Sequence, residues 1–225
     1  MTDASFDGTI QSEFKTAQKI KLNDGSHSRL YRGWNELKVS GKLPERRSYH
    51  VGCIHQGYMY VFGGQDLKEG SVNSTWKINI QSIVEQCTQG VTNVVAEWEH
   101  LNCKGTIPGP MSHHSAFVHE NKLYCYGGLI GSQGSQSNGD FWILDLNKNI
   151  WSKMVIQQPV KKGESQKCCE ARDDHASVFD EKTQILYVFG GYVNGDKSND
   201  MWCYNLLSEE WKCLHPGDYK LDVSK

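Results

Sequence analysis

Hydrophobic and polar residues follow the same pattern three times along the chain. In each copy, a run dominated by apolar and aromatic residues ends in two successive glycines, and these runs are Tyr58–Gly64, Leu123–Gly128 and Leu186–Gly191. Short runs rich in aromatic and β-branched residues predict β-strands. Because the first glycines recur at positions 63, 127 and 190, a spacing of about 64 residues, the pattern indicates a repeat protein.

Three further strands are predicted in each copy. A histidine opens the strand that precedes each glycine pair, at His50, His114 and His175. A tryptophan lies on the strand after the pair, at Trp76, Trp142 and Trp202, and a second one opens a Trp-x-x-Leu or Trp-x-x-Met strand at Trp98, Trp151 and Trp211. Each copy is therefore a unit of four short strands, over about residues 48–101, 113–154 and 173–214.

The glycine pairs and the apolar faces determine how the units pack. Successive glycines supply positive φ angles or allow close backbone approach, where a side chain would clash with a neighbouring sheet. A four-stranded sheet that is apolar on both faces has to bury both of them, so the units stack on one another. Radial stacking of such sheets is a β-propeller. The glycines concerned are Gly63, Gly64, Gly127, Gly128, Gly190 and Gly191.

These residues resemble the Kelch repeat. The Kelch pattern of a Pro-x-x-Arg-x-x-His lead, a strand ending in Gly-Gly, a tryptophan or tyrosine strand and a closing Trp-x-x-Leu is complete in the first unit, at Pro44, Arg47, His50, Gly63, Gly64, Trp76, Trp98 and Leu101. The second unit has Met111 in place of the arginine, and in the third an insertion displaces the proline to Pro159. The resemblance covers about residues 34–214 and implies an all-β, Kelch-type β-propeller that serves as a binding platform or scaffold.

Three four-stranded blades do not complete a ring, because propellers have about 4–8 blades. Residues 34–37 are predicted to be the last strand of a preceding blade, and residues 1–33 to be an extension in which 20–31 resemble a hairpin. Residues 215–225 are interpreted as a tail or a linker to further repeats. The chain is expected to be a fragment of a longer repeat protein, or a half-ring that joins a second copy as a six-bladed propeller. Either way, exposed end blades invite self-association.

Composition narrows the classes of function. With 24 Lys and Arg against 26 Asp and Glu, the net charge is −2, and we expect neither a nucleic acid nor a membrane as partner. The first residues lack the apolar run of a secretory signal, and no apolar stretch approaches the ~20 residues that span a bilayer. These features favour a cytoplasmic chain, whose eight cysteines are expected to stay thiols.

Partner binding is expected at the end of the propeller where the second-to-third-strand connections and the inter-blade segments lie. The repeated Arg47 and Arg172 are candidates for binding a partner's carboxylates, although a group that recurs in several blades is better explained as fixing the inter-blade turn. The third inter-blade segment is longer and carries Lys161, Lys162 and Lys167, which predicts a recognition loop or a merely solvated one. The long connection 81–97, at the opposite end, is a further candidate.

The sequence offers no catalytic constellation. It contains no phosphate-binding glycine loop, nucleophile elbow, metalloprotease helix or Cys-x-x-Cys, and the repeat spreads the histidines around the arc. We therefore predict a protein-interaction scaffold or adaptor, with no enzyme activity, no cofactor and no metal. Two alternatives stay open: a Kelch-like metal-dependent oxidase, and the substrate-recognition part of a ubiquitin ligase whose ligase-binding domain lies elsewhere.

Overall fold

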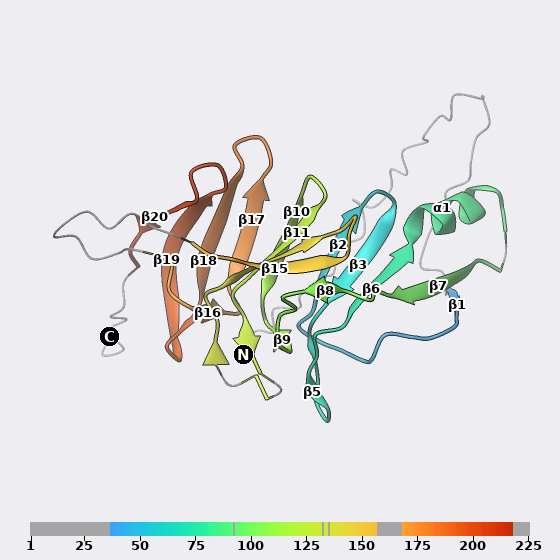
Figure 1. The fold of residues 1–225 in the computed structure, drawn as a ribbon, viewed down its shortest axis with the longest axis horizontal. Helices are drawn as coiled ribbons and strands as arrows, with labels where there is room; N and C mark the ends of the chain where they lie inside the picture. Colours follow the sequence, from blue (N-terminus) through green and yellow to red (C-terminus); the bar gives the residue numbers. More distant parts are fainter. Residues whose placement is uncertain (1–36, 92, 132, 135, 157–167, 218–225) are drawn as a thin grey trace, which may run out of the picture.

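The computed structural model describes residues 37–91, 93–131, 133–134, 136–156 and 168–217 (Figure 1). Its main elements are three antiparallel sheets that stand side by side in an arc, and we call them blades 1, 2 and 3. The predicted hairpin of residues 20–31 lies outside the described residues, as do most of the leading strand 34–37 and most of the tail 215–225.

The strands of each blade are neighbours in chain order, as in an up-and-down sheet. Blade 1 contains β2 (Val51–His55), β3 (Tyr58–Phe62), β6 (Thr75–Asn79) and β7 (Val95–His100). Blade 2 contains β10 (Ser115–His119), β11 (Lys122–Tyr126), β14 (Phe141–Asp145) and β15 (Ile150–Met154). Blade 3 contains β17 (Ala176–Asp180), β18 (Ile185–Val193), β19 (Asp196–Asn205) and β20 (Glu210–His215). The predicted all-β fold of three four-stranded antiparallel sheets is confirmed.

Blades 1 and 2 each carry a fifth strand that the sequence analysis did not predict. β1 (Lys38–Ser40) pairs in parallel with β7, and β8 (Lys104–Gly105) pairs in parallel with β15. Although β8 follows the last strand of blade 1 in the chain, its backbone hydrogen bonds go to the outer strand of blade 2. The segment therefore ties two adjacent blades together. Strands of two or three residues are too short to show an alternation in sequence.

The connection between β6 and β7 contains a helix, α1 (Ile80–Thr88), where the sequence analysis identified only a long connection. Asn79 caps this helix, because its side chain accepts a hydrogen bond from the Ser82 amide at 2.8 Å. The helix contacts β3 and β7 but contains no fully buried residue. A helix this short gives little periodic signal in the sequence. Among the described residues, no helix has the length and apolar character needed to cross a membrane.

The hydrophobic core lies between blades rather than within one sheet. One cluster of buried residues joins blades 1 and 2, where the rings of Phe62 and Trp151 have centroids 4.6 Å apart. A second cluster joins blades 2 and 3, where Phe117 stacks on Phe179 with centroids 4.2 Å apart. Because burial of apolar area is the main favourable term in folding, each blade depends on its neighbour for stability.

The glycine pairs lie where the next blade approaches. Gly63 has a φ of +64°, and a Cβ atom on it would lie 2.6 Å from the Met111 carbonyl oxygen and 2.7 Å from the His114 ring. The following residue, Gly64, donates its amide to the same Met111 oxygen at 2.8 Å. The expectation that these glycines combine a positive φ with close approach of a neighbouring sheet is thus confirmed between blades 1 and 2.

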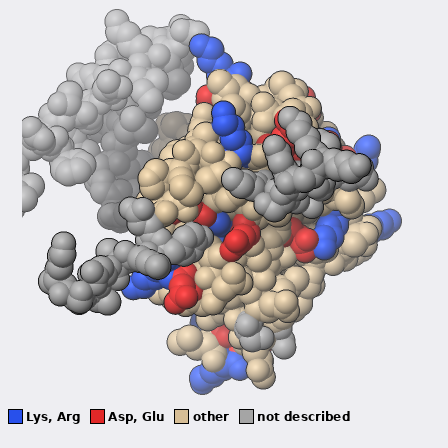
Figure 2. All heavy atoms as spheres, turned by 90° about the vertical axis from the view of Figure 1, so that its left-hand side faces the viewer, with Lys and Arg blue, Asp and Glu red and all other residues tan. Residues whose placement is uncertain are grey.

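At both ends of the arc, apolar side chains of the described residues are more exposed than their counterparts in other blades. Phe62, which precedes the glycine pair of blade 1, is fully buried, whereas its counterpart in blade 3, Phe189, is 53% exposed. At the other end, Ile54 on the inner strand of blade 1 is exposed, whereas Val118 at the same position in blade 2 is half-buried. Figure 2 views the molecule from the side on which β18–β20 lie in Figure 1, and most of the described surface there carries no charge. The expected self-association depends on these exposed side chains and stays a prediction.

Candidate functional site

Hairpins and inter-blade segments form one end of the arc, at the bottom of Figure 1, which we call the loop end. The hairpin of blade 1 consists of β4 (Gln65–Asp66) and β5 (Gly70–Ser71), and that of blade 2 of β12 (Leu129–Ile130) and β13 (Gln136–Ser137). In blade 3, β18 and β19 continue to a tight turn. The sequence predicts loops for all three connections.

Each inter-blade segment pairs with the hairpin of the blade that it enters. Ser48 forms a β-bridge with Gln65, β9 (Met111–Ser112) pairs with β12, and β16 (Arg172–Asp173) pairs with β18. Backbone hydrogen bonds of 2.9 Å join Ser48 and Gln65 in both directions. Because both halves of the loop end are held by strand pairing, it is a preorganised surface, which lowers the entropy lost on binding.

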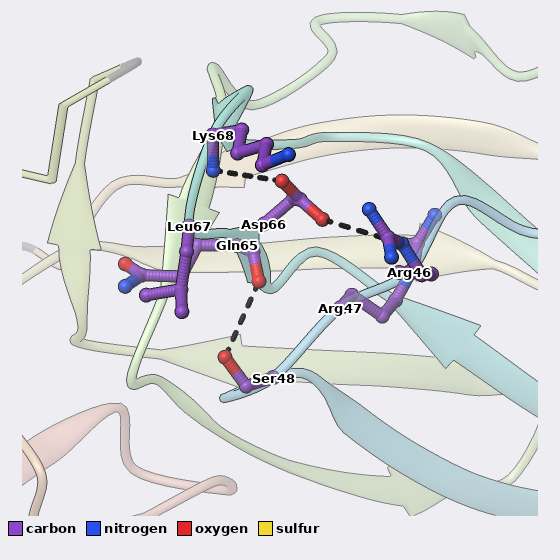
Figure 3. Close-up of a pocket in the computed structure, with 7 residues that line it drawn as sticks. All are labelled: Arg46, Arg47, Ser48, Gln65, Asp66, Leu67 and Lys68. Atoms are coloured by element: carbon purple, nitrogen blue, oxygen red, sulfur yellow. Dashed lines mark hydrogen bonds and ion pairs between the residues drawn. The ribbon is translucent and has the colours of Figure 1, made fainter.

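A pocket of about 390 Å³ opens at the loop end of blade 1 (Figure 3). It lies between residues 46–48 of the inter-blade segment and residues 65–68 of the hairpin. The Asp66 carboxylate accepts hydrogen bonds from the amides of Lys68 and Glu69, at 2.8 and 3.2 Å, and so shapes the hairpin turn. The same hydrogen bonds lower the pKa of Asp66, so the pocket wall carries an anion at neutral pH.

Two cations and one apolar side chain project from this pocket into solvent. Arg46 is 86% exposed, and its guanidinium lies 3.9 Å from the Asp66 carboxylate. Such an exposed pair contributes little, so the guanidinium can bind another anion. Leu67, at the hairpin tip, is 92% exposed, and Lys68 beside it is exposed as well. Figure 3 shows the charged groups of Arg46 and Lys68 on the same side of the pocket as Asp66.

Arg47, which the sequence analysis proposed for partner binding, is held inside blade 1. Its guanidinium donates to the Gly63 carbonyl at 2.9 Å and to the Ser74 carbonyl and hydroxyl oxygens at 3.3 and 2.7 Å. It also forms an ion pair with Glu45, and its side chain is only 4% exposed. Burial acts to raise the pKa of Glu45, but hydrogen bonds and the Arg47 charge outweigh burial and lower it.

Arg172, the second arginine proposed for partner binding, is completely buried in blade 3. Its guanidinium donates two hydrogen bonds to the Asp200 carboxylate, at 2.7 and 2.9 Å, and one to the Gly190 carbonyl at 2.9 Å. Burial acts to lower the pKa of Arg172 and to raise that of Asp200, but the hydrogen bonds between them reverse both shifts. Neither repeated arginine faces solvent in this fold. Among the arginines that the structure describes, the exposed one is Arg46, which the repeat pattern does not include.

Blade 2 has Met111 in place of the arginine, and this side chain is fully buried. Methionine needs no counter-charge, and Asp140, which matches Asp200 in the repeat, pairs instead with the Lys153 ammonium at 2.7 Å. The same ammonium lies over the Trp142 ring, 5.6 Å from its centroid. The side chain at this position is therefore directed inward in all three described blades, and a carboxylate is buried beside it in blade 3, where Arg172 pairs with Asp200.

Two buried histidines at the blade interfaces predict that acid destabilises the fold. Burial is the main cause that lowers the pKa of His114 to about 3 and that of His175 to about 4, against about 6.5 in an unfolded chain. Between these values the unfolded state binds protons that the folded state does not. The free energy of unfolding therefore has its full value above about pH 6.5. It decreases as the pH falls below this value, by about 1.4 kcal/mol per pH unit for each histidine.

Urea denaturation measured at a series of pH values from about 7 to 4 gives this slope. A His114→Leu variant is expected to show a slope smaller by one proton, whatever its stability at neutral pH. An unchanged slope would contradict the assignment of this proton to His114.

The remaining predicted positions divide between described and undescribed parts of the chain. Lys161, Lys162 and Lys167 lie outside the described residues. A second pocket, of about 450 Å³, is lined by residues on both sides of that segment, including Cys169. Cys169 is buried, and burial raises its pKa to about 12, whereas Cys168 is exposed. In the part of the chain that the structure describes, no three His, Cys, Asp or Glu side chains gather as a metal site.

Comparisons with known proteins agree with the repeat architecture. A family model described as the KLHDC2/KLHL20/DRC7 Kelch-repeats domain matches residues 27–169, and the Kelch motif matches residues 183–216. Among curated proteins, Leucine-zipper-like transcriptional regulator 1 of Homo sapiens is 27% identical over 184 residues, which cover 81% of this chain and 20% of that protein. Kelch domain-containing protein 2 of Bos taurus is 26% identical over 203 residues, covering 81% of this chain and 45% of that protein.

A third relative, Ras guanine nucleotide exchange factor F of Dictyostelium discoideum, is 26% identical over 187 residues, which cover 83% of this chain and 14% of that protein. The chain thus spans less than half the length of each of these relatives. Since one family model covers more than half of the 225 residues and a Kelch motif matches most of the third blade, the chain belongs to the Kelch-repeat family and its sheets are blades of a Kelch-type β-propeller.

Proposed function

We propose that this chain is a non-catalytic, cytoplasmic protein-interaction scaffold or adaptor that binds a partner protein through its loop end. The observation that carries the proposal is the contrast between two neighbouring arginines. Arg47 belongs to the repeat pattern and forms its contacts inside blade 1. Arg46 is not repeated and projects into solvent beside a pocket. Residues that the fold does not need, presented on a rigid surface, are typical of binding sites.

Leu67 is the apolar anchor of the proposed site. A leucine at a hairpin tip contributes nothing to the core when almost all of its surface is in water. Its transfer into a partner's apolar pocket would stabilise a complex by about 1.5–3 kcal/mol. The adjacent charges of Arg46 and Lys68 favour an acidic rim around such a pocket. The site therefore fits a partner surface that combines an apolar pocket with Asp or Glu side chains.

Kelch-repeat relatives support a protein-interaction or substrate-recognition role for the family, and they leave the partner open. If the chain is instead the substrate-recognition part of a ubiquitin ligase, the substrate would bind at the same loop end, and the ligase-binding domain would lie elsewhere.

Affinity capture from cell extract with a double variant, Arg46→Glu with Leu67→Ser, tests the proposal. Proteins that bind the wild-type chain are expected to be recovered at least about tenfold less with this variant, since loss of a central anchor costs about 2 kcal/mol or more. Quantitative mass spectrometry of the captured proteins is the measurement.

The chain offers a matched control at the opposite end. Leu207 is also an exposed leucine in a tight turn, and Lys182 is an exposed cation in another turn there. The double variant Leu207→Ser with Lys182→Glu is expected to capture the same proteins as the wild type. The proposal fails if both double variants lose the same proteins, or if neither loses any.

A further inference from the structure

The residue before each repeat histidine has an unusual backbone. Tyr49, His113 and Asp174 have φ angles of +53°, +58° and +51°, a region that non-glycine residues seldom occupy. They are joined from blade to blade, because the His113 amide donates to the Tyr49 carbonyl and the Asp174 amide to the His113 carbonyl, each at 3.1 Å. We call these three residues the inner rim. They lie at the loop end, directly after the segments that pair with the hairpins.

The backbone conformation of the inner rim is the same in the three blades, but its side chains differ. The same strained conformation and the same hydrogen bond recur in successive blades, so every blade needs the backbone geometry. A tyrosine, a histidine and an aspartate nevertheless occupy the three positions, so the fold does not require any one of them. Side chains that the fold does not need, presented on a rigid surface, are typical of binding sites, as argued above for Arg46.

Tyr49 and Asp174 are the two residues of the inner rim that can bind a cation. The Tyr49 ring is about half exposed and stacks on the His113 ring, with centroids 3.8 Å apart and planes at 19°. His113 is oriented by its Nδ1 atom, which lies 3.0 Å from the Ser112 hydroxyl. Asp174 is exposed and forms no ion pair with any described residue, and the same holds for Glu170 on the same inter-blade segment. An aromatic face and an unpaired carboxylate both bind Lys or Arg side chains.

We propose that the inner rim binds a basic side chain of an extended partner segment, with its charge at Asp174 and its apolar stem or a neighbouring residue against the Tyr49–His113 stack. This inference rests on the proposed function and assigns a second contact point within the loop end.

Selection of short random peptides displayed on phage tests this assignment. Peptides that bind the immobilised wild-type chain are expected to be enriched in Lys and Arg, and synthetic copies are expected to bind Asp174→Asn about tenfold more weakly. Tyr49→Leu is expected to weaken them about threefold. Glu181→Gln is the matched control, because Glu181 is an exposed acid in the β17–β18 turn at the opposite end. Thermal unfolding of each variant verifies that it is folded.

The outcomes separate this inference from the proposed function. If the selected peptides lose affinity with Arg46→Glu and Leu67→Ser but bind Asp174→Asn and Tyr49→Leu as tightly as the wild type, the loop end binds and the inner rim does not. If no peptide binds above background, or if binding is indifferent to every loop-end variant, the proposed function fails as well. Equal losses with Glu181→Gln and Asp174→Asn would show a general charge effect and overturn the assignment to the inner rim.

Discussion

Replacing Arg172 with methionine is expected to lower the free energy of unfolding by about 3–5 kcal/mol, the largest effect that we predict for a single substitution. The substitution removes the two hydrogen bonds to Asp200 and leaves that carboxylate in the interior without a counter-charge. Urea denaturation followed by tryptophan fluorescence measures the change, because the Trp202 indole donates a hydrogen bond to the same carboxylate at 2.6 Å.

The chain suggests the rescue of this variant. Blade 2 has a buried methionine at the corresponding position and directs its aspartate outward to Lys153. The double variant Arg172→Met with Asp200→Asn removes both charges and is expected to recover at least half of the lost stability. Arg47→Met should cost less, because Glu45 is half exposed and can be solvated by water. If Arg172→Met lowers the free energy of unfolding no more than Arg47→Met does, burial of the Arg172–Asp200 ion pair is not the cause of its effect on stability.

Replacing Gly63 with alanine is expected to destabilise the chain by about 2–4 kcal/mol, through two additive causes. A left-handed backbone costs a non-glycine residue about 1 kcal/mol, and overpacking of a filled interface costs about 1–3 kcal/mol. The new methyl group would meet the Met111 carbonyl oxygen and the His114 ring at less than 3 Å, and the carbonyl cannot move without losing its hydrogen bond to Gly64.

Gly131→Ala isolates the backbone cause. Gly131 also has a positive φ, of +96°, but a Cβ atom there would meet no atom of the described residues within 4 Å, its chain neighbours aside. Its substitution is expected to cost only about 1 kcal/mol. The difference between the two variants, read from denaturation midpoints, measures the contact between blades 1 and 2. Equal effects would mean that the glycine pair is kept for its φ angle alone.

Much of the fold was predictable, because the interactions that define a blade recur in every copy. Apolar alternation marked the four strands of each blade, and the paired glycines marked the place where the next blade packs. The sequence signal failed where an element is short or borrowed from another blade. β1 and β8 have two or three residues and exist because the outer strand of a blade offers free backbone groups. α1 depends on the Asn79 cap and on packing against β3 and β7.

The candidate site was predictable only in its location. Strand order placed the hairpins and inter-blade segments at one end, but it did not show which of Arg46 and Arg47 reaches solvent. Adjacent residues in an extended segment point in opposite directions, and only the packed structure shows which direction leads inward. The signal that was available is that Arg47 fits the repeat pattern and Arg46 does not. The positive φ angles of the inner rim could not be predicted from the sequence, because histidine and aspartate are enriched at positive φ but tyrosine is not, and most histidines and aspartates have a negative φ.

The sequence by itself determined that this chain builds four-stranded sheets that pack face to face, because alternation and spacing are local properties that each repeat carries in full. Tertiary structure alone decided which side chains form contacts within and between the blades and which are exposed for a partner to bind. That division depends on burial, and burial is set by residues from the neighbouring blade, about sixty positions away in the chain.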